Sequence, residues 1–105
     1  CYPASMVKHI VLWNVTDSHD GMDKAAIIEK MREMIVGMKK TVPQIQEIEF
    51  GSDFNRSEAA FEVALYSSFT DRSALNEYQR HPEHEKVKAF VGQVTTARAV
   101  VDYEV

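Results

Sequence analysis

The sequence has almost no cysteine, no long apolar run and no cluster of basic residues, and each absence excludes a class of protein. Its only cysteine among 105 residues is Cys1, so the chain forms no internal disulfide and no cysteine metal cage. No apolar run approaches the roughly 20 residues that span a bilayer. The net charge of −4 argues against a nucleic-acid or anionic-membrane surface. We therefore expect a soluble protein with neither partner, and a reducing, cytoplasmic location.

The motifs of several common enzyme classes are missing as well. The four glycines form no phosphate-binding loop, and the chain has neither a GxSxG nucleophile elbow nor an HExxH zinc motif. No cysteine is placed to act as a nucleophile. The sequence therefore gives no reason to expect a cofactor or a metal.

The length fits one domain with its own hydrophobic core. An alternating apolar strand begins abruptly at Met6, after "CYPAS". We interpret residues 1–5 as a tag or N-terminal extension and 6–105 as the domain. Cys1 could instead carry a lipid, but a polar linker usually follows such a cysteine. No signal peptide is visible.

The pattern of apolar residues predicts an alternation of strands and helices. Period-two alternation favours strands over 6–15, 44–53, 57–69 and 95–105, and helical spacing favours helices over about 20–42, 70–80 and 82–94. We expect Asp20 to cap the first helix and Ser68 or Thr70 to cap the second. The order strand, helix, strand, strand, broken helix, strand is that of an α+β, ferredoxin-like fold. Its four-stranded antiparallel sheet would carry helices on one face.

The first strand is apolar on both of its faces, which a monomer of this fold does not explain. Val7, Val11 and Trp13 lie on one face, while Ile10 and Leu12 lie on the other. Helices on one side of the sheet leave the second face bare, and a large bare apolar face is not tolerated on a soluble monomer. We therefore predict a homodimer in which the two sheets face each other.

The segment "YQRHPEHEKV" at 78–87 concentrates the residues that could carry chemistry. Pro82 should end one helix and begin the next, with His81 as the N-cap. His84 then lies near the positive end of the second helix, where the neutral imidazole is favoured. Tyr78 should point towards the sheet and His9 towards the helices, so these side chains and His84 could converge on one pocket.

Two predictions follow for that pocket. Tyr78 and His84 are its candidate catalytic residues. The candidate substrate-binding residues are His9, Val11, Trp13, Val63, Leu65 and Phe90. An alternative is that HPEH is only a capped helix joint whose imidazoles bond to the backbone. A metal site at His81 and His84 is a weaker alternative, because no motif supplies a third ligand.

The segments "MVKHIVLWNV", "EFGSD", "ALYSSF", "YQRHPEH" and "VVDYEV", in this order, resemble the stress-responsive A/B barrel domain family of the dimeric α/β-barrel superfamily. The resemblance covers essentially all of 6–105. It implies a ferredoxin-like fold and dimers whose sheets face each other as a barrel, which agrees with the reasoning from the residues.

The resemblance also implies a chemistry. One plant member closes a linear polyketide by aldol condensation without a cofactor, using a tyrosine and the second histidine of an HPxH motif. These match Tyr78 and His84, and another pocket histidine matches His9. By this resemblance His84 would be the general base and Tyr78 would bond the carbonyl oxygen where charge develops. The chain differs in having Val63 in place of a further histidine and Ile35, or a neighbour, in place of a tyrosine, so we expect a different substrate.

Two hypotheses of function result. The first is a small dimeric enzyme, cyclase- or lyase-like, acting without cofactor on a hydrophobic carbonyl compound. A cofactor-free monooxygenase is a related option. The second is a non-catalytic dimeric binding or stress-protective module in which HPEH is structural.

Overall fold

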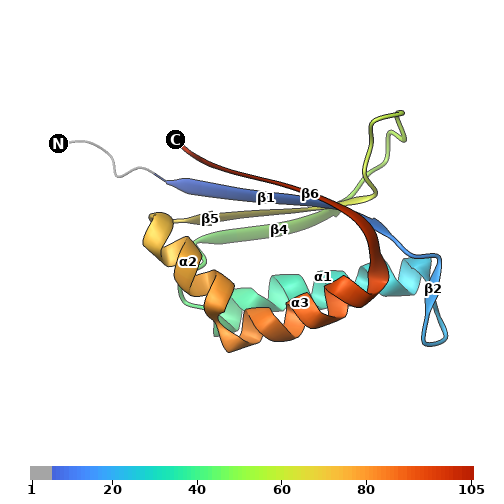
Figure 1. The fold of residues 1–105 in the computed structure, drawn as a ribbon, viewed down its shortest axis with the longest axis horizontal. Helices are drawn as coiled ribbons and strands as arrows, with labels where there is room; N and C mark the ends of the chain where they lie inside the picture. Colours follow the sequence, from blue (N-terminus) through green and yellow to red (C-terminus); the bar gives the residue numbers. More distant parts are fainter. Residues whose placement is uncertain (1–5) are drawn as a thin grey trace.

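A computed structural model describes residues 6–105, so the predicted extension at 1–5 lies outside the described residues. The elements follow in the order β1 (Val7–Val15), β2 (Ser18–His19), β3 (Met22–Asp23), α1 (Lys24–Thr41), β4 (Glu47–Ser52), β5 (Val63–Phe69), α2 (Arg72–Arg80), α3 (Pro82–Val94) and β6 (Thr95–Glu104). The main sheet is antiparallel throughout, with the strand order β4-β5-β1-β6. Figure 1 shows all three helices on one face of this sheet. The ferredoxin-like prediction is confirmed.

The alternating sequence of β1 decides which of its side chains enter the core. Val7, Val11, Trp13 and Val15 are buried on the helix side, and His9 is buried among them. Strand residues alternate between faces, so the side chains between them lie on the opposite side. The apolar stripe of α1 packs against the sheet through Ile27, Met31, Ile35 and Met38. The core therefore lies between the helices and one face of the sheet.

The opposite face of the sheet carries apolar side chains that the rest of residues 6–105 leaves exposed. The β1–β6 register pairs Ile10 with Val101 and Lys8 with Tyr103, and paired residues of antiparallel strands share a face. Val101 and Tyr103 are 51% and 44% exposed. In Figure 1 this face has no helix over it.

The cap predictions for α1 and α2 were wrong. Asp20 and Gly21 have positive φ angles of 48° and 79° and form the turn between β2 and β3, which delays the helix. Asp23 caps α1 instead, accepting a hydrogen bond from the Ala26 N–H at 2.9 Å. Asp71 likewise caps α2 through the Ala74 N–H at 2.8 Å. A short carboxylate next to the first helical residue accepts such a bond directly.

The predicted strand at 57–69 is shorter in the structure and begins at Val63. Glu62 holds this point in place, because its carboxylate accepts hydrogen bonds from the Val15 N–H at 2.7 Å and from the Lys24 ammonium at 2.6 Å. These bonds lower the pKa of Glu62 below its usual value. The loop before Glu62 projects beyond the sheet in Figure 1, with Phe54 almost fully exposed.

No helix among residues 6–105 is both long enough and apolar enough to cross a membrane.

Candidate functional site

The joint between α2 and α3 orients the candidate catalytic residues. His81 has an extended backbone, with φ −69° and ψ 137°, as expected before a proline. Its N–H closes α2 by donating to the Tyr78 carbonyl at 3.1 Å, and its Nδ1 accepts from the Glu83 N–H at 3.0 Å to open α3. Pro82 takes the first helical position, where its missing N–H costs nothing. The predicted capping role of His81 is confirmed.

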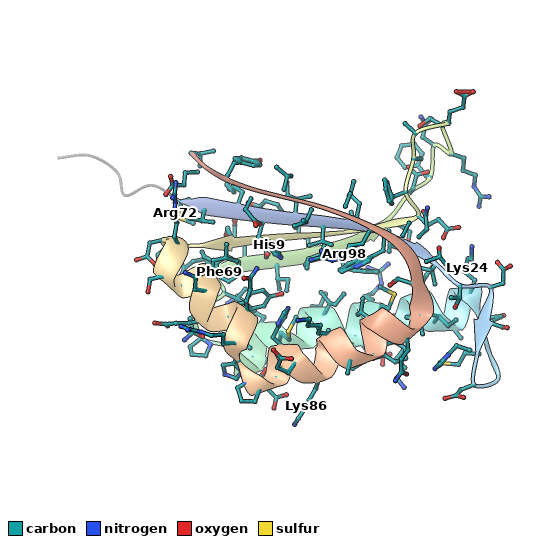
Figure 2. All side chains as sticks on the ribbon, in the orientation of Figure 1. His9, Lys24, Phe69, Arg72, Lys86 and Arg98 are labelled. Atoms are coloured by element: carbon teal, nitrogen blue, oxygen red, sulfur yellow. The ribbon has the colours of Figure 1, made fainter. Side chains whose placement is uncertain are left out.

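The joint brings Tyr78, from the last turn of α2, against His84, from the first turn of α3. Their ring centroids lie 4.4 Å apart. The Tyr78 ring also lies 4.9 Å from that of Phe69 and 6.0 Å from that of His9, both on the sheet. Tyr78 is 1% exposed. Figure 2 shows His9 and Phe69 between the sheet and the helices. The helix joint and the sheet therefore converge on Tyr78.

One hydrogen bond determines which nitrogen of neutral His84 is free. Its Nδ1 lies 3.2 Å from the main-chain carbonyl of Gln79, and a carbonyl only accepts hydrogen bonds. Nδ1 therefore carries the hydrogen, and Nε2 keeps its lone pair. Burial lowers the pKa of His84 below 6.5, although the bond to Gln79 opposes the shift. At neutral pH the side chain is thus an uncharged imidazole with an available basic nitrogen.

Tyr78 can act as a hydrogen-bond donor, whereas His84 can act as a base. Burial raises the pKa of its hydroxyl well above the ordinary value of 10.0, so the group stays protonated and can donate. Within residues 6–105 the Tyr78 hydroxyl makes no hydrogen bond. Among the same residues, the only side-chain polar atom that is both buried from solvent and without a partner is Gln44 Oε1. The Tyr78 hydroxyl is therefore neither satisfied nor sealed, and it is free to bond a ligand.

A hydrogen-bonded histidine–aspartate pair lies next to Tyr78 on the sheet. His9 Nδ1 hydrogen-bonds the carboxylate of Asp102, its register partner on β6. Because the carboxylate accepts, the hydrogen lies on Nδ1 of His9. His9 is 3% exposed, whereas Asp102 lies on the exposed edge strand. The pair extends the row of polar groups from His84 across Tyr78 to the edge of the sheet.

A cavity of about 480 Å³ opens between α3, α1 and the sheet. Side chains predicted from the sequence line it: His9, Val11, Trp13, Leu65, Tyr78 and His84. Val63 and Phe90 do not. Val63 is buried in the core, and Phe90 packs beside His19 and under the ammonium of Lys30. The cavity walls thus combine an apolar floor on the sheet with polar groups at the helix joint. The catalytic and binding roles of these residues stay predictions.

Sequence reasoning missed three polar residues of this region. Asp102 accepts a hydrogen bond from His9, while Lys88 and Arg98 line the cavity. The alternation of Arg98, Val100 and Asp102 along the closing strand was visible, and so was the four-residue spacing of His84 and Lys88 on one helix face. Which strand residue opposes His9 depends on the register, and no local pattern encodes it.

Residues 6–105 contain no group of three or more His, Cys, Asp or Glu side chains placed to hold a metal ion. His81, one of the two histidines of the weaker metal alternative, is engaged as a cap.

The fold is shared with several solved structures. A dimeric protein of unknown function with a ferredoxin-like fold from Bacteroides fragilis is 33% identical, with 95% of this chain and 96% of that chain covered and a TM-score of 0.83. A dimeric ferredoxin-like protein of unknown function from Thermobifida fusca is 17% identical, covering 100% and 95%, with a TM-score of 0.81. A hydroxynitrile lyase from Passiflora edulis is 17% identical, covering 98% and 95%, with a TM-score of 0.83. The last two likenesses show the fold alone.

No curated protein matches the sequence. The family model described as Stress Responsive A/B Barrel Domain matches residues 7–105, which is nearly the whole chain. The match agrees with the strand order, with the helices on one sheet face and with the resemblance of the sequence segments. The chain belongs to the stress-responsive A/B barrel domain family.

Proposed function

We propose that the chain is a homodimeric protein whose cavity binds a hydrophobic carbonyl compound and catalyses cofactor-free, cyclase- or lyase-like acid/base chemistry on it. One observation carries the proposal. The imidazole of His84 and the phenol of Tyr78, whose hydroxyl has no hydrogen-bond partner within residues 6–105, lie with their ring centroids 4.4 Å apart on one cavity of about 480 Å³. A base and a hydrogen-bond donor at such close range suit the removal of a proton next to a carbonyl group.

In this reaction His84 is the base. Its Nε2 takes a proton from a carbon activated by neighbouring carbonyl groups, and the electron pair of the C–H bond moves onto the carbonyl oxygen. Burial supports the role, because it lowers the pKa of His84 and keeps the imidazole uncharged at neutral pH. The bond from Nδ1 to Gln79 holds the ring orientation during the transfer.

Tyr78 stabilises the enolate that results. Its hydroxyl donates to the oxygen on which negative charge develops, and its raised pKa keeps the hydrogen on the phenol. The enolate carbon can then attack a second carbonyl of the same molecule, and the resulting alkoxide recovers the proton from His84. The proton that His84 removes from carbon is returned to oxygen, so these steps need no oxidant, reductant or metal.

The apolar lining sets the class of compound. Val11, Trp13 and Leu65 form the floor of the cavity, and burial of their surface favours a hydrophobic ligand. The chain differs from the plant cyclase at Val63 and at Ile35 or a neighbour. Val63 and Ile35 are both buried, and Ile35 lines the cavity. An aliphatic wall at Ile35 supports a ligand different from that of the plant enzyme.

The dimer is part of the proposal. The uncovered sheet face carries Val101 and Tyr103 exposed beside Ile10 and Leu12, and solved structures of the same fold are described as dimeric. A second copy packed on this face would remove the apolar surface from water. Light scattering at micromolar concentration should give twice the 12.0 kDa of one chain; a monomer mass would contradict the dimer.

The test of the chemistry uses benzoylacetone, a hydrophobic compound with an acidic carbon between two carbonyl groups. Deuterium incorporation at that carbon, followed by NMR in heavy water, should exceed the buffer rate with the wild-type protein. His84→Ala and Tyr78→Phe should lose the acceleration while keeping the wild-type circular dichroism and unfolding midpoint. Exchange at the buffer rate with wild-type protein would contradict the proposed chemistry for this class of carbon acid.

A second candidate function rests on the joint itself. His81 caps α3, and His84 bonds the carbonyl of Gln79, so both histidines join α2 to α3. In a non-catalytic module, the HPEH segment would serve only to join the two helices through these hydrogen bonds. If His84→Ala mainly lowers the unfolding midpoint and a thermal-shift screen finds no ligand, the chain is a non-catalytic module in which HPEH is structural.

A further inference from the structure

Among the described residues, two cations line the cavity and no carboxylate does. Lys88 comes from α3 and Arg98 from β6, while the other lining residues are uncharged or histidine. The whole chain is acidic, with 16 Asp and Glu against 12 Lys and Arg. The cavity is therefore a local exception to the charge of the protein.

Neither cation is neutralised by the rest of the described chain. No ion pair or side-chain hydrogen bond within residues 6–105 involves Lys88 or Arg98, whereas Lys24, Arg72 and Lys86 each pair with a glutamate. Asp102 is the carboxylate nearest to Arg98 on the same strand face, and it is bound to His9. Two positive charges at an apolar cavity thus lack an internal anion.

The position of the cations relative to the reactive pair follows from the backbone. Lys88 lies four residues after His84 on α3, about 6 Å along the helix axis. Arg98 is the register partner of Trp13 and shares its helix-side face. Four residues separate Arg98 from Asp102, roughly 13 Å along the strand. Figure 2 shows Arg98, like His9, between the sheet and the helices.

Exposure places the two cations at the mouth. Lys88 and Arg98 are exposed, whereas His9, Trp13 and Tyr78 are buried at the inner wall. A ligand with its apolar body on Trp13 and its carbonyl at Tyr78 would lie in the cavity that both cations line. Guanidinium and ammonium groups bind carboxylates through charge-assisted hydrogen bonds.

From this arrangement we infer that the ligand of the cavity is a hydrophobic carbonyl compound with a carboxylate, and that Lys88 and Arg98 bind the carboxylate at the mouth. The inference rests on the proposed function, since it names the substrate class of the same site. It makes the two cations specificity-determining residues, because a neutral analogue leaves both without a partner.

The test compares phenylbutyrate with phenylbutyramide, which have the same apolar body and differ in the carboxylate. Trp13 is the only tryptophan of the chain and lines the cavity, so its emission reports occupancy. The acid should bind about five- to tenfold more tightly than the amide, as expected when two exposed cations pair with one carboxylate. Added salt should reduce the difference, because exposed charges are screened.

Variants at Arg98 and Lys88 test whether these two residues cause the preference for the acid over the amide. Arg98→Gln and Lys88→Gln should each reduce the acid-to-amide affinity ratio, and the double variant should bring it close to one. Both positions are exposed, so the fold should persist. Lys86→Gln is the matched control on the same helix, because Lys86 pairs with Glu83 at 3.1 Å and does not line the cavity. It should keep the wild-type ratio.

Equal binding of acid and amide to the wild-type protein would overturn the inference, and so would a ratio that survives in the double variant. If the amide still quenches Trp13 and benzoylacetone exchange is still accelerated, the proposed function stands without the carboxylate. If neither compound binds and benzoylacetone exchange stays at the buffer rate, the proposed function and this inference fail together.

Discussion

His9 on the first strand of the sheet and Asp102 on the last are register partners, and the buried imidazole Nδ1 hydrogen-bonds the carboxylate across the two strands. The two residues are 93 positions apart in the chain. Removing the carboxylate leaves a buried N–H without a partner. Asp102→Ala should therefore lower the free energy of unfolding by about 1–3 kcal/mol, whereas Asp102→Asn, which keeps an acceptor oxygen, should cost less.

Chemical denaturation of these variants measures the difference. Glu104→Ala is the matched control, because Glu104 lies two residues away on the same strand and pairs with the exposed Arg72. An exposed ion pair contributes at most about 1 kcal/mol. An equal decrease in the free energy of unfolding for Asp102→Ala and Glu104→Ala would show that the hydrogen bond to His9 contributes no more stability than an exposed ion pair.

Tyr78→Phe should reduce the catalysed exchange without lowering the stability of the fold. The hydroxyl has no hydrogen-bond partner among the described residues, so its replacement by hydrogen keeps the packing against Phe69 and His84. The unfolding midpoint should stay near that of the wild type. Loss of a donor to a developing oxyanion should reduce the accelerated exchange of benzoylacetone by about 100-fold. NMR exchange rates and thermal melts test this; unchanged exchange would remove Tyr78 from the proposed mechanism.

The catalysed exchange should depend on pH through His84. Its pKa in the folded protein lies below 6.5 because of burial, and only the neutral imidazole accepts a proton. The rate above the buffer background should therefore rise with pH to a midpoint below 6.5 and be level at neutral pH. A midpoint at or above 6.5 would contradict the assignment of His84 as the base.

The same shift predicts how stability varies with pH. The unfolded chain takes up a proton at His84 near pH 6.5, whereas the folded chain resists it. The unfolded state therefore binds more protons in this window, and the free energy of unfolding falls as pH decreases from 6.5 to the lower folded pKa. His84→Gln should make the decrease shallower than in the wild type. Urea denaturation at several pH values measures both slopes.

Gly92 offers a way to close the cavity. It lies on α3, lines the cavity, and a Cβ added there would meet nothing within 4 Å. Gly92→Leu should reduce quenching of Trp13 by phenylbutyrate without loss of fold, since leucine is a better helix former than glycine by up to about 1 kcal/mol. Gly37→Leu on α1 is the matched control, because Gly37 is equally open but does not line the cavity. Equal quenching in both variants would place the ligand elsewhere.

Local patterns were enough to predict the fold and several of the side chains that line the cavity. The alternation in β1 identified the buried face with His9, Val11 and Trp13. Pro82 predicted the helix joint, and with it the capping by His81. The caps at Asp23 and Asp71 were missed, because the choice among neighbouring polar residues depends on where the backbone first turns helical. The hairpin of β2 and β3 moved that point for α1.

The sequence by itself determined the order of strands and helices, the joint at Pro82 and the presence of Tyr78 and His84 on either side of it. These depend on the intrinsic conformational limits of proline and on periodicities that neighbouring residues carry. Only the tertiary structure decided that Asp102 holds His9, that Lys88 and Arg98 line the same cavity, and that Phe90 lies outside it. Strand register and helix rotation place these residues, and a slip of one position would reverse the face of every strand side chain.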